Sequence, residues 1–544
     1  MGKGRDRYQR LEPGIAVSIS GQKRVEYREP GETVSSGSFL ETGKEGNIAM
    51  GEKRILDQSD RRERMLTALY LFIFFVVASS IALAQPLYDT PPVYANAPDE
   101  HARYLVPQYI CEHGKLPTAY DEEVRIPGYG SSYALYNVLP YIFMGWVMRF
   151  VDLFTDSELY LLYSARLVNV LFGIAMAFVV RKLAVRIFDG EAKKICLDWL
   201  FCFLVMFMPQ SLFLHTYVNT DSMAMLSTAL ILYALVSIYQ DGFYVFNSGV
   251  LCTGVISCTL SYYNAYGYIV SAVLLCLAYF VKPVSGKPHE AGQGSLRISY
   301  DWKNMFRHAV PITAVILLGT AWWFIRSYIL YDGDILGFRT ADKMMELYAV
   351  DKVNPLTSQT YQQMGYTLRQ MIRETDYLTI AYASFVGAYG SLSIFADIWI
   401  YRFYKLFFYG GLLGYLVTIP FYRKHHEGKR LFFHANLIFC ILMPVILMVY
   451  YAYTSDFQAQ GRYMMPMLLP LMIYVVKGLE RLAALVYRMA HGSVEKPGRE
   501  SRTVTWETVM RIAVILAMAG IILMLLWMVY GTAMPIYCQF LTVN

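Results

Sequence analysis

The chain has 544 residues, of which 56% are hydrophobic and only 17% are charged, with a formal net charge of +6. Soluble domains carry about 25% charged residues, so this composition, with a mean hydropathy of +0.34, excludes an ordinary water-soluble protein. Apolar runs of about 20 residues can cross a bilayer. Such runs recur from residue 65 onward and predict an all-α polytopic membrane protein, with no nucleic-acid partner.

The segment 1–64 is polar, rich in Gly and Ser, and holds 13 Lys and Arg residues. No apolar run of the signal-peptide type precedes Met65. This composition is typical of a disordered, basic cytoplasmic tail. Its positive charges would orient the protein and attract anionic lipid headgroups.

Apolar stretches that predict eleven membrane spans follow the tail. They cover about 65–85, 158–180, 196–216, 222–240, 308–330, 401–422, 431–453, 463–487 and 509–530, with a shorter pair at 247–262 and 266–281. We interpret 65–487 as one catalytic transmembrane domain, and 488–544 as a cytoplasmic loop plus the final transmembrane helix.

One further apolar segment, Tyr133–Phe154, is ambiguous, and the charge pattern decides how it is interpreted. If this segment does not span, 34 of the 48 Lys and Arg residues fall on the cytoplasmic side. Because basic residues favour that side of the membrane, we expect 133–154 to be juxtamembrane or re-entrant. The N-terminus is then cytoplasmic, the C-terminus is exterior, and two long loops, 86–157 and 331–400, face outward.

The two exterior loops are too long to be simple linkers. Ser358–Arg373 mixes apolar and polar residues as an interfacial helix would, and Ala381–Phe395 is suited to dipping back against other helices. We expect the loops to roof a cavity above the spans. Eight cysteines form no CxxC or zinc-type cluster, although Cys111 and Cys538 both face outward and could pair.

The first exterior loop contains Asp99, Glu100, His101 and Arg103 within the five positions that open one predicted helix, which continues to about His113. A helix start alone explains an acidic cap or first-turn residue. It does not explain an imidazole and a guanidinium on the next turn. A carboxylate, an imidazole and a guanidinium together suit deprotonation of a hydroxyl and binding of a phosphate.

Asp221 is the second candidate, at the outer end of a predicted span and on the same face as Asp99. It too could be a plain first-turn acidic residue. Two carboxylates that meet in an exterior site could instead divide the roles of base and of metal or substrate positioning. His215 is either an additional metal ligand or an ordinary hydrogen-bonded histidine.

Four of the arginines that do not fall on the cytoplasmic side form a candidate set for a lipid phosphate or pyrophosphate. Each could also snorkel to headgroups. They are Arg103, Arg125, Arg326 and Arg462.

Nucleotide-binding and hydrolase motifs are absent from the sequence: there is no Walker loop, no GxGxxG after a strand, no HExxH and no GxSxG. ATP does not supply energy outside the cytoplasm, so a substrate there must arrive activated. A polyprenyl-phosphate sugar is the obvious carrier.

These residues resemble the GT-C superfamily of membrane glycosyltransferases. The opening 99–104 (DEHARY) is similar to the DE-x-RY opening of the aminoarabinose lipid A transferases, and the chain is similar also to the protein O-mannosyltransferases. It resembles more closely a bacterial multi-pass family of unassigned function. The matching motifs are PDEHAR (98–103), NTD (219–221), WWFIR (322–326), SFVGAYG (384–390) and QGRYMMP (460–466).

The resemblance implies a GT-C-like bundle in a bacterial cell membrane that transfers a sugar from a polyprenyl-phosphate donor to a glycan, lipid or protein acceptor on the exterior face. It implies Asp99 as general base, Glu100 and Asp221 for metal or acceptor positioning, and Arg103 for the donor phosphate. One extra residue before Arg103 turns that side chain by about 100°, and Arg125 is the substitute. A divalent metal held by Glu100, His101 and His215 stays open.

Two other functions stay open. A transporter or flippase of lipid-linked saccharides would need charges at mid-membrane, and the middles of the predicted spans are nearly free of them. A polysaccharide polymerase or ligase would share donor and topology and differ only in acceptor.

Overall fold

The computed structural model describes residues 42–136, 138–284, 297–350, 358–422, 428–491 and 500–541. Helices dominate these residues, as the sequence predicts, and the strands form two short antiparallel pairs. Most of the predicted tail, 1–41, lies outside the described residues. Its remainder, 42–64, belongs to the first helix, α1 (Thr42–Ala84), and so differs from the expected disordered segment.

Six of the described helical segments are long and apolar enough to cross a membrane. They are Asp60–Ala84, Glu158–Ile187, Asp221–Asp241, Trp302–Leu330, Arg430–Thr454 and Trp506–Phe540. The predicted eleven spans therefore stay a prediction. Two of the expected spans, α9 (Val245–Thr259) and α10 (Gly267–Tyr279), extend only about 22 and 20 Å at 1.5 Å per residue, less than the 30 Å hydrocarbon core.

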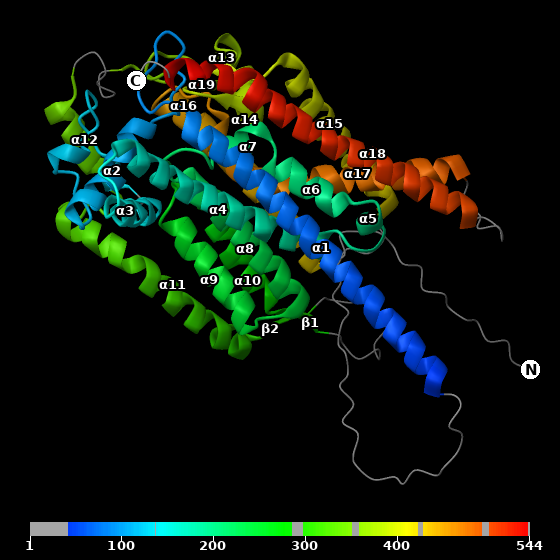
Figure 1. The fold of residues 1–544 in the computed structure, drawn as a ribbon. Coiled ribbons are helices and arrows are strands. Elements are labelled where there is room, and N and C mark those ends of the chain that lie inside the picture. The colour runs from blue at the N-terminus through cyan, green and yellow to red at the C-terminus, as the bar shows by residue number, and fades with distance from the viewer. Residues whose placement is uncertain are drawn as a thin grey trace, which may run out of the picture.

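The long helices lie side by side in a bundle (Figure 1). One group contains α1, α4 (Glu158–Ile187), α8 (Asp221–Asp241), α9, α10 and α11 (Trp302–Leu330). A second group contains α6 (Leu197–Met206), α15 (Ile398–Thr418), α16 (Gly428–Thr454), α17 (Leu468–His491) and α18 (Glu500–Leu526). Their shared core is apolar and contains fully buried rings such as Phe74 and Phe207.

The expected span 196–216 is broken into two helices, α6 and α7 (Pro209–Phe213), and the short helix α5 (Gly190–Lys194) precedes it. Pro209 explains the break, because proline lacks the amide hydrogen that continues a helix and disfavours helical geometry at the residue before it. Met208 accordingly has an extended backbone. The chain then turns through 214–220 and enters α8 at Asp221.

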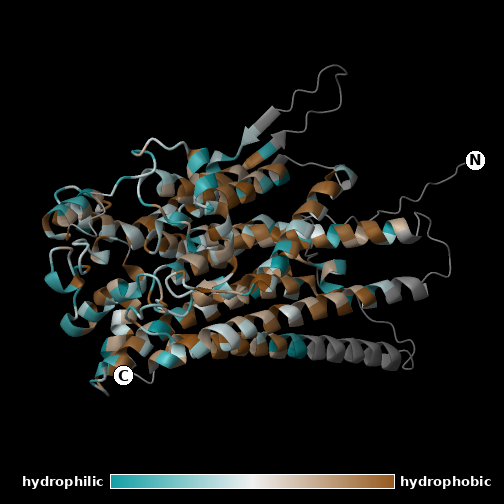
Figure 2. Ribbon diagram, turned by 90° about the horizontal axis from the view of Figure 1, so that it is seen from above, coloured by the Kyte–Doolittle hydropathy of each residue, from teal (hydrophilic) through white to brown (hydrophobic). Residues whose placement is uncertain are grey.

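The two long loops lie at one end of the bundle, which we call the loop end and which carries most of the hydrophilic colour in Figure 2, whereas β1 and β2 lie at the other end (Figure 1). The first loop forms α2 (Glu100–His113), the 3-10 turns η1 (Glu122–Val124) and η2 (Tyr133–Leu135), and α3 (Leu139–Asp152). At 14 residues, α3 extends about 21 Å. It packs on α2 and exposes Trp146 and Phe150 on its other side, as a juxtamembrane helix would.

The second loop contains α12 (Phe338–Tyr348), α13 (Leu368–Glu374), α14 (Tyr377–Gly387) and the hairpin strands β3 (Ala388–Tyr389) and β4 (Ile394–Phe395). The predicted interfacial helix 358–373 is shorter than expected, because a capping box formed by Thr367 and Gln370 starts α13 only at Leu368. Residues 381–395 do pack inward: Phe385 and Tyr389 are buried.

The remaining elements are short. Strands β1 (Val281–Val284) and β2 (Arg297–Tyr300) pair between α10 and α11. The 3-10 turns η3 (Tyr263–Ala265), η4 (Ile419–Tyr422) and η5 (Gly461–Met467) precede α10, follow α15 and lead into α17. A π-helical stretch, η6 (Trp527–Ala533), joins α18 to α19 (Met534–Leu541).

Candidate functional site

The two predicted carboxylates, Asp99 and Asp221, meet at the loop end through one arginine. Arg103, one turn into α2, places Nη2 3.9 Å from Asp99 Oδ2 and Nη1 3.9 Å from Asp221 Oδ2. Asp221 is the first residue of α8, and Thr220 before it accepts a hydrogen bond from Arg103 Nη1 at 3.3 Å. The starts of α2 and α8 therefore face one another across Arg103.

Asp99 does not cap its helix, although a helix start was the simplest interpretation of its position. Its backbone is left-handed, with φ +59°, and its side chain accepts no bond from the first turn. Asx residues tolerate this conformation better than most. The carboxylate is thereby free to reach away from α2, where Arg462 Nη2 donates to Oδ2 at 2.6 Å.

Arg462 arrives at the site from η5, where the chain approaches another backbone very closely. A Cβ at Gly461 would lie 2.1 Å from the amide nitrogen of Phe385, so only glycine fits. The Gly461 amide also donates to Ser384 Oγ at 2.7 Å. The SFVGAYG and QGRYMMP motifs therefore pack directly against one another. This contact holds η5 in the position from which Arg462 reaches Asp99.

The site is electrically balanced and mostly buried, with one open member. The side chains of Arg103, Arg462 and Asp221 are 6%, 3% and 4% exposed, whereas that of Asp99 is 41% exposed. Burial would raise the pKa of the Asp99 carboxyl, but the guanidinium groups of Arg462 and Arg103 outweigh it and hold that pKa below its usual range. Asp99 is therefore ionised at neutral pH.

Several buried polar atoms of this cluster lack a hydrogen-bond partner among the described residues. They are Nε of Arg103, Nε of Arg462 and Oδ2 of Asp221. An unmet buried donor costs about 1–3 kcal/mol, so such atoms are rare in folded proteins. Two unmet guanidinium donors in one cluster suit an anionic ligand.

Tyrosines that the sequence does not mark as functional complete the site. The Tyr133 ring centroid lies 4.8 Å from the Arg103 guanidinium, and Arg462 Nη2 donates to the Tyr463 hydroxyl at 3.1 Å. The Tyr463 hydroxyl in turn donates to Gln458. Because the chain has 45 tyrosines, residue type alone does not single out any of them. Of these two tyrosines, only Tyr463 lies in one of the sequence motifs, QGRYMMP.

Glu100 does not join Asp99 in the site, which corrects its predicted catalytic or metal-binding role. The side chain is fully buried and points the other way, into a two-point ion pair with Arg166 at 2.8 and 2.7 Å. Oε1 also accepts the Val218 amide at 2.8 Å. Glu100 is the first helical residue of α2 whereas Asp99 has a left-handed backbone, and the two neighbouring carboxylates point to different partners.

The predicted metal ligands Glu100, His101 and His215 do not form a ligand set. His101 packs against the Tyr88 ring with centroids 4.9 Å apart. His215 is buried, and its Nδ1 shares a hydrogen bond of 2.6 Å with Ser222 Oγ. Between Asp99 and Asp221 the nearest groups are guanidinium ions, whose positive charge opposes a cation there, so the residues present do not fit a divalent metal.

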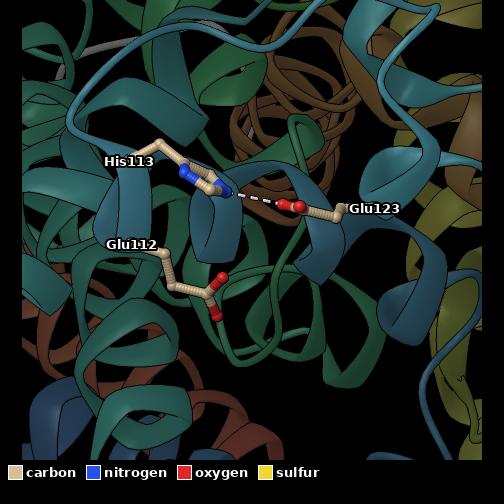
Figure 3. A group of neighbouring side chains, drawn as sticks. All are labelled: Glu112, His113 and Glu123. Carbon is tan, nitrogen blue, oxygen red and sulfur yellow. Dashed lines mark hydrogen bonds and ion pairs between the residues drawn. The ribbon is translucent and has the colours of Figure 1, made fainter.

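One group of metal-ligand residues does occur within the described ranges, at the far end of α2. Glu112, His113 and Glu123 bring one ligand atom each within 4.8 Å of one another, and His113 Nε2 and Glu123 Oε2 are 2.6 Å apart (Figure 3). All three side chains are exposed. They lie more than three turns of α2 from Asp99 and are not part of its site.

The other two predicted phosphate-binding arginines have partners of their own, although Nε of Arg125 and Nη1 of Arg326 are also buried without a hydrogen-bond partner among the described residues. Arg125 pairs with Glu122 at 3.6 Å and stacks 3.8 Å from the Tyr348 ring centroid. Arg326 of α11 donates to the Pro117 carbonyl at 2.7 Å. Arg125 thus joins the first loop to the second at Tyr348, and Arg326 joins α11 to the first loop at Pro117.

The possible disulfide is not present, since Cys111 and Cys538 are both free, the first buried and the second exposed.

Comparison with known proteins places the chain in a family, while its structural neighbours are distant. No curated protein matches the sequence. One similar structure is the archaeal oligosaccharyltransferase AglB from Archaeoglobus fulgidus, in complex with an inhibitory peptide and a dolichol-phosphate. Its sequence is 13% identical, the TM-score is 0.44, and the match covers 84% of this chain and 55% of the AglB chain. A second structure of the oligosaccharyltransferase from that organism, with Zn and sulfate, is 12% identical with a TM-score of 0.46, covering 84% and 52%.

ArnT from Cupriavidus metallidurans bound to undecaprenyl phosphate is 12% identical with a TM-score of 0.42, and covers 88% of this chain and 75% of its own. The chain spans about half the length of the oligosaccharyltransferases that it matches. A family model described as "Predicted membrane protein (DUF2142)" matches residues 106–472, about two thirds of the sequence. The chain therefore belongs to the DUF2142 family of predicted membrane proteins.

Proposed function

We propose that this protein is a GT-C-type membrane glycosyltransferase that moves a sugar from a polyprenyl-phosphate donor to a cell-envelope acceptor on the exterior face of a bacterial membrane. The observation that carries the proposal is the cluster of two carboxylates and two buried guanidinium groups with unmet donors at the loop end. Arginine forks match phosphate oxygens, and a carboxylate beside them can take a proton.

In the proposed reaction, Arg103 and Arg462 hold the donor phosphate. An acceptor hydroxyl or amine attacks the anomeric carbon, the bond from that carbon to the phosphate oxygen breaks, and the polyprenyl phosphate leaves with both electrons. Asp99 receives the acceptor proton, and Asp221 keeps Arg103 in place. The exposure of Asp99, 41% against 4% for Asp221, supports this division, because Asp99 is the more open of the two carboxylates.

The pairing with Arg462 controls the basicity of Asp99. With Arg462 2.6 Å away, the pKa of Asp99 is low and the carboxylate is a weak base. When Arg462 turns its donors to a phosphate, Asp99 loses a partner and its pKa rises toward its usual range. The base thus strengthens only when the donor is bound.

Exchange of Asp99 for asparagine tests this function. Membranes that contain the Asp99→Asn protein should insert it normally, but should transfer no labelled sugar from a polyprenyl-phosphate donor. The matched control is Glu112→Gln, which neutralises an exposed carboxylate at the other end of α2 and should keep wild-type transfer. Unchanged glycan product with Asp99→Asn would contradict catalysis and favour transport of a lipid-linked saccharide.

A further inference from the structure

A second charged cluster lies directly beneath the site and is centred on Arg166, a fully buried residue of α4. A guanidinium has five N–H donors, and Arg166 makes five hydrogen bonds. Nε and Nη2 bind Glu100 at 2.8 and 2.7 Å, and Nη1 binds the Ala82 and Gln85 carbonyls at 2.9 and 2.8 Å. Nη2 also binds the Pro86 carbonyl at 3.4 Å.

These partners belong to the last turn of α1, the residues after it, and the first turn of α2. Glu100 extends the connection to a third segment, because its Oε1 also accepts the Val218 amide. One turn further along α4, Asn169 Nδ2 donates to the carbonyls of Tyr217 and Asn219. A single face of α4 therefore holds α1, α2 and the segment 217–219 in one arrangement.

The two ends of this network stand next to the two carboxylates of the site. Glu100 directly follows Asp99, and Val218 lies three residues before Asp221. We propose that Arg166, acting through Glu100, is a positioning residue that fixes Asp99 and Asp221 relative to one another. This inference rests on the proposed function, because placement matters only if both carboxylates serve one substrate.

The chemistry of the network supports positioning over simple stabilisation. Burying an ion pair often stabilises a fold no more than apolar residues of the same volume would, so stability alone does not explain a charge at this depth. The planar guanidinium of Arg166, with its five directed hydrogen bonds, fixes the orientation of Glu100 as well as its distance. Lysine, with three donors on one nitrogen, cannot reach Glu100 and the Ala82 and Gln85 carbonyls together.

The test measures the dissociation constant of undecaprenyl phosphate for the folded, monodisperse fraction of each full-length variant. A residue that only stabilises the fold leaves this constant unchanged in the protein that remains folded. Arg103 contacts both Asp99 and Asp221, so a shift of either carboxylate moves a phosphate-binding guanidinium. Loss of one charge-assisted hydrogen bond to the phosphate corresponds to about tenfold or more in affinity, so Glu100→Gln and Arg166→Lys should weaken binding at least tenfold. The exchanged variant E100R/R166E should not recover it, because glutamate at 166 cannot donate to the Ala82 and Gln85 carbonyls.

The same helix offers a matched control. Arg181 lies 15 residues from Arg166, about 22 Å along α4, and forms a buried pair with Asp198 at 2.9 Å as well as a second ion pair with Glu63. Asp198→Asn should lower the unfolding temperature as Glu100→Gln does, yet keep the dissociation constant within twofold of wild type. If Glu100→Gln and Arg166→Lys bind the lipid as wild type does while Arg462→Gln does not, the positioning role is wrong and the proposed function survives.

If the wild-type protein does not bind the lipid, the proposed function fails, and a cryo-EM map of the Glu100→Gln protein decides the inference by itself. The map should show the first turn of α2 and the segment 216–220 displaced from one another. An unchanged arrangement of these segments would overturn the positioning role.

Discussion

Replacing Arg462 with glutamine removes the side chain that joins η5 to the start of α2. In the structure Arg462 donates to Asp99 at 2.6 Å and leaves Nε without a partner among the described residues. Charge-assisted hydrogen bonds contribute about 1.5–3 kcal/mol, and each 1.4 kcal/mol is a factor of ten in affinity. We therefore expect undecaprenyl phosphate to bind Arg462→Gln about 10- to 150-fold more weakly.

The variant should still fold, because the carboxylate that it leaves unpaired is 41% exposed and can be hydrated. Arg462→Lys should fall between wild type and Arg462→Gln, since lysine keeps the charge and loses the fork. The assay is equilibrium binding of radiolabelled undecaprenyl phosphate to purified protein, with Arg369→Gln, an exposed arginine of α13, as the control. Binding of Arg462→Gln within twofold of wild type would refute the phosphate-binding role of this arginine.

Three further outcomes follow from the structure. Glu100→Gln leaves Arg166 as an unpaired buried charge, which should cost about 3–5 kcal/mol; thermal unfolding measures it, and an unchanged transition would contradict the buried pair. Gly461→Ala forces a Cβ against the Phe385 backbone, so it should lower the unfolding temperature and reduce lipid binding together, whereas loss of neither would refute the close approach. The pKa of Asp99 in the folded protein lies below its ordinary value, so the ionised carboxylate stabilises the fold above a pH of about 4, and this contribution is lost as the pH falls further. Acid unfolding of Asp99→Asn should lack this loss of stability. Identical acid-unfolding profiles for wild type and variant would contradict the pairing of Asp99 with Arg462.

Sequence pattern was sufficient for the features that depend on local chemistry. The helix periods and apolar runs predict most helices, and positions at the starts of α2 and α8 suffice to expect Asp99 and Asp221 on one face. Pro209 marks the break between α6 and α7 in the sequence itself. The early start of α1 at Thr42 was missed, because residues 42–64 are polar and lack the apolar period of a packed helix.

The sequence does not show which partner each charged side chain contacts in the fold. Glu100 and Asp99 are adjacent carboxylates, and only the fold decides that one turns to Arg166 and the other to Arg462. Arg326 resembles Arg462 in its outward position near a span end, yet it binds the carbonyl of Pro117. Such differences depend on contacts between residues about 65 to 365 positions apart, which composition and spacing do not encode.

A cryo-EM structure of the full-length protein with undecaprenyl phosphate would show which arginines bind the lipid phosphate. We expect phosphate density within hydrogen-bond distance of both Arg103 and Arg462, with Asp99 released from Arg462 and open to an acceptor. Density for the phosphate at Arg326 or Arg125, or at the opposite end of the bundle, with the Asp99–Arg462 pair intact, would contradict this expectation.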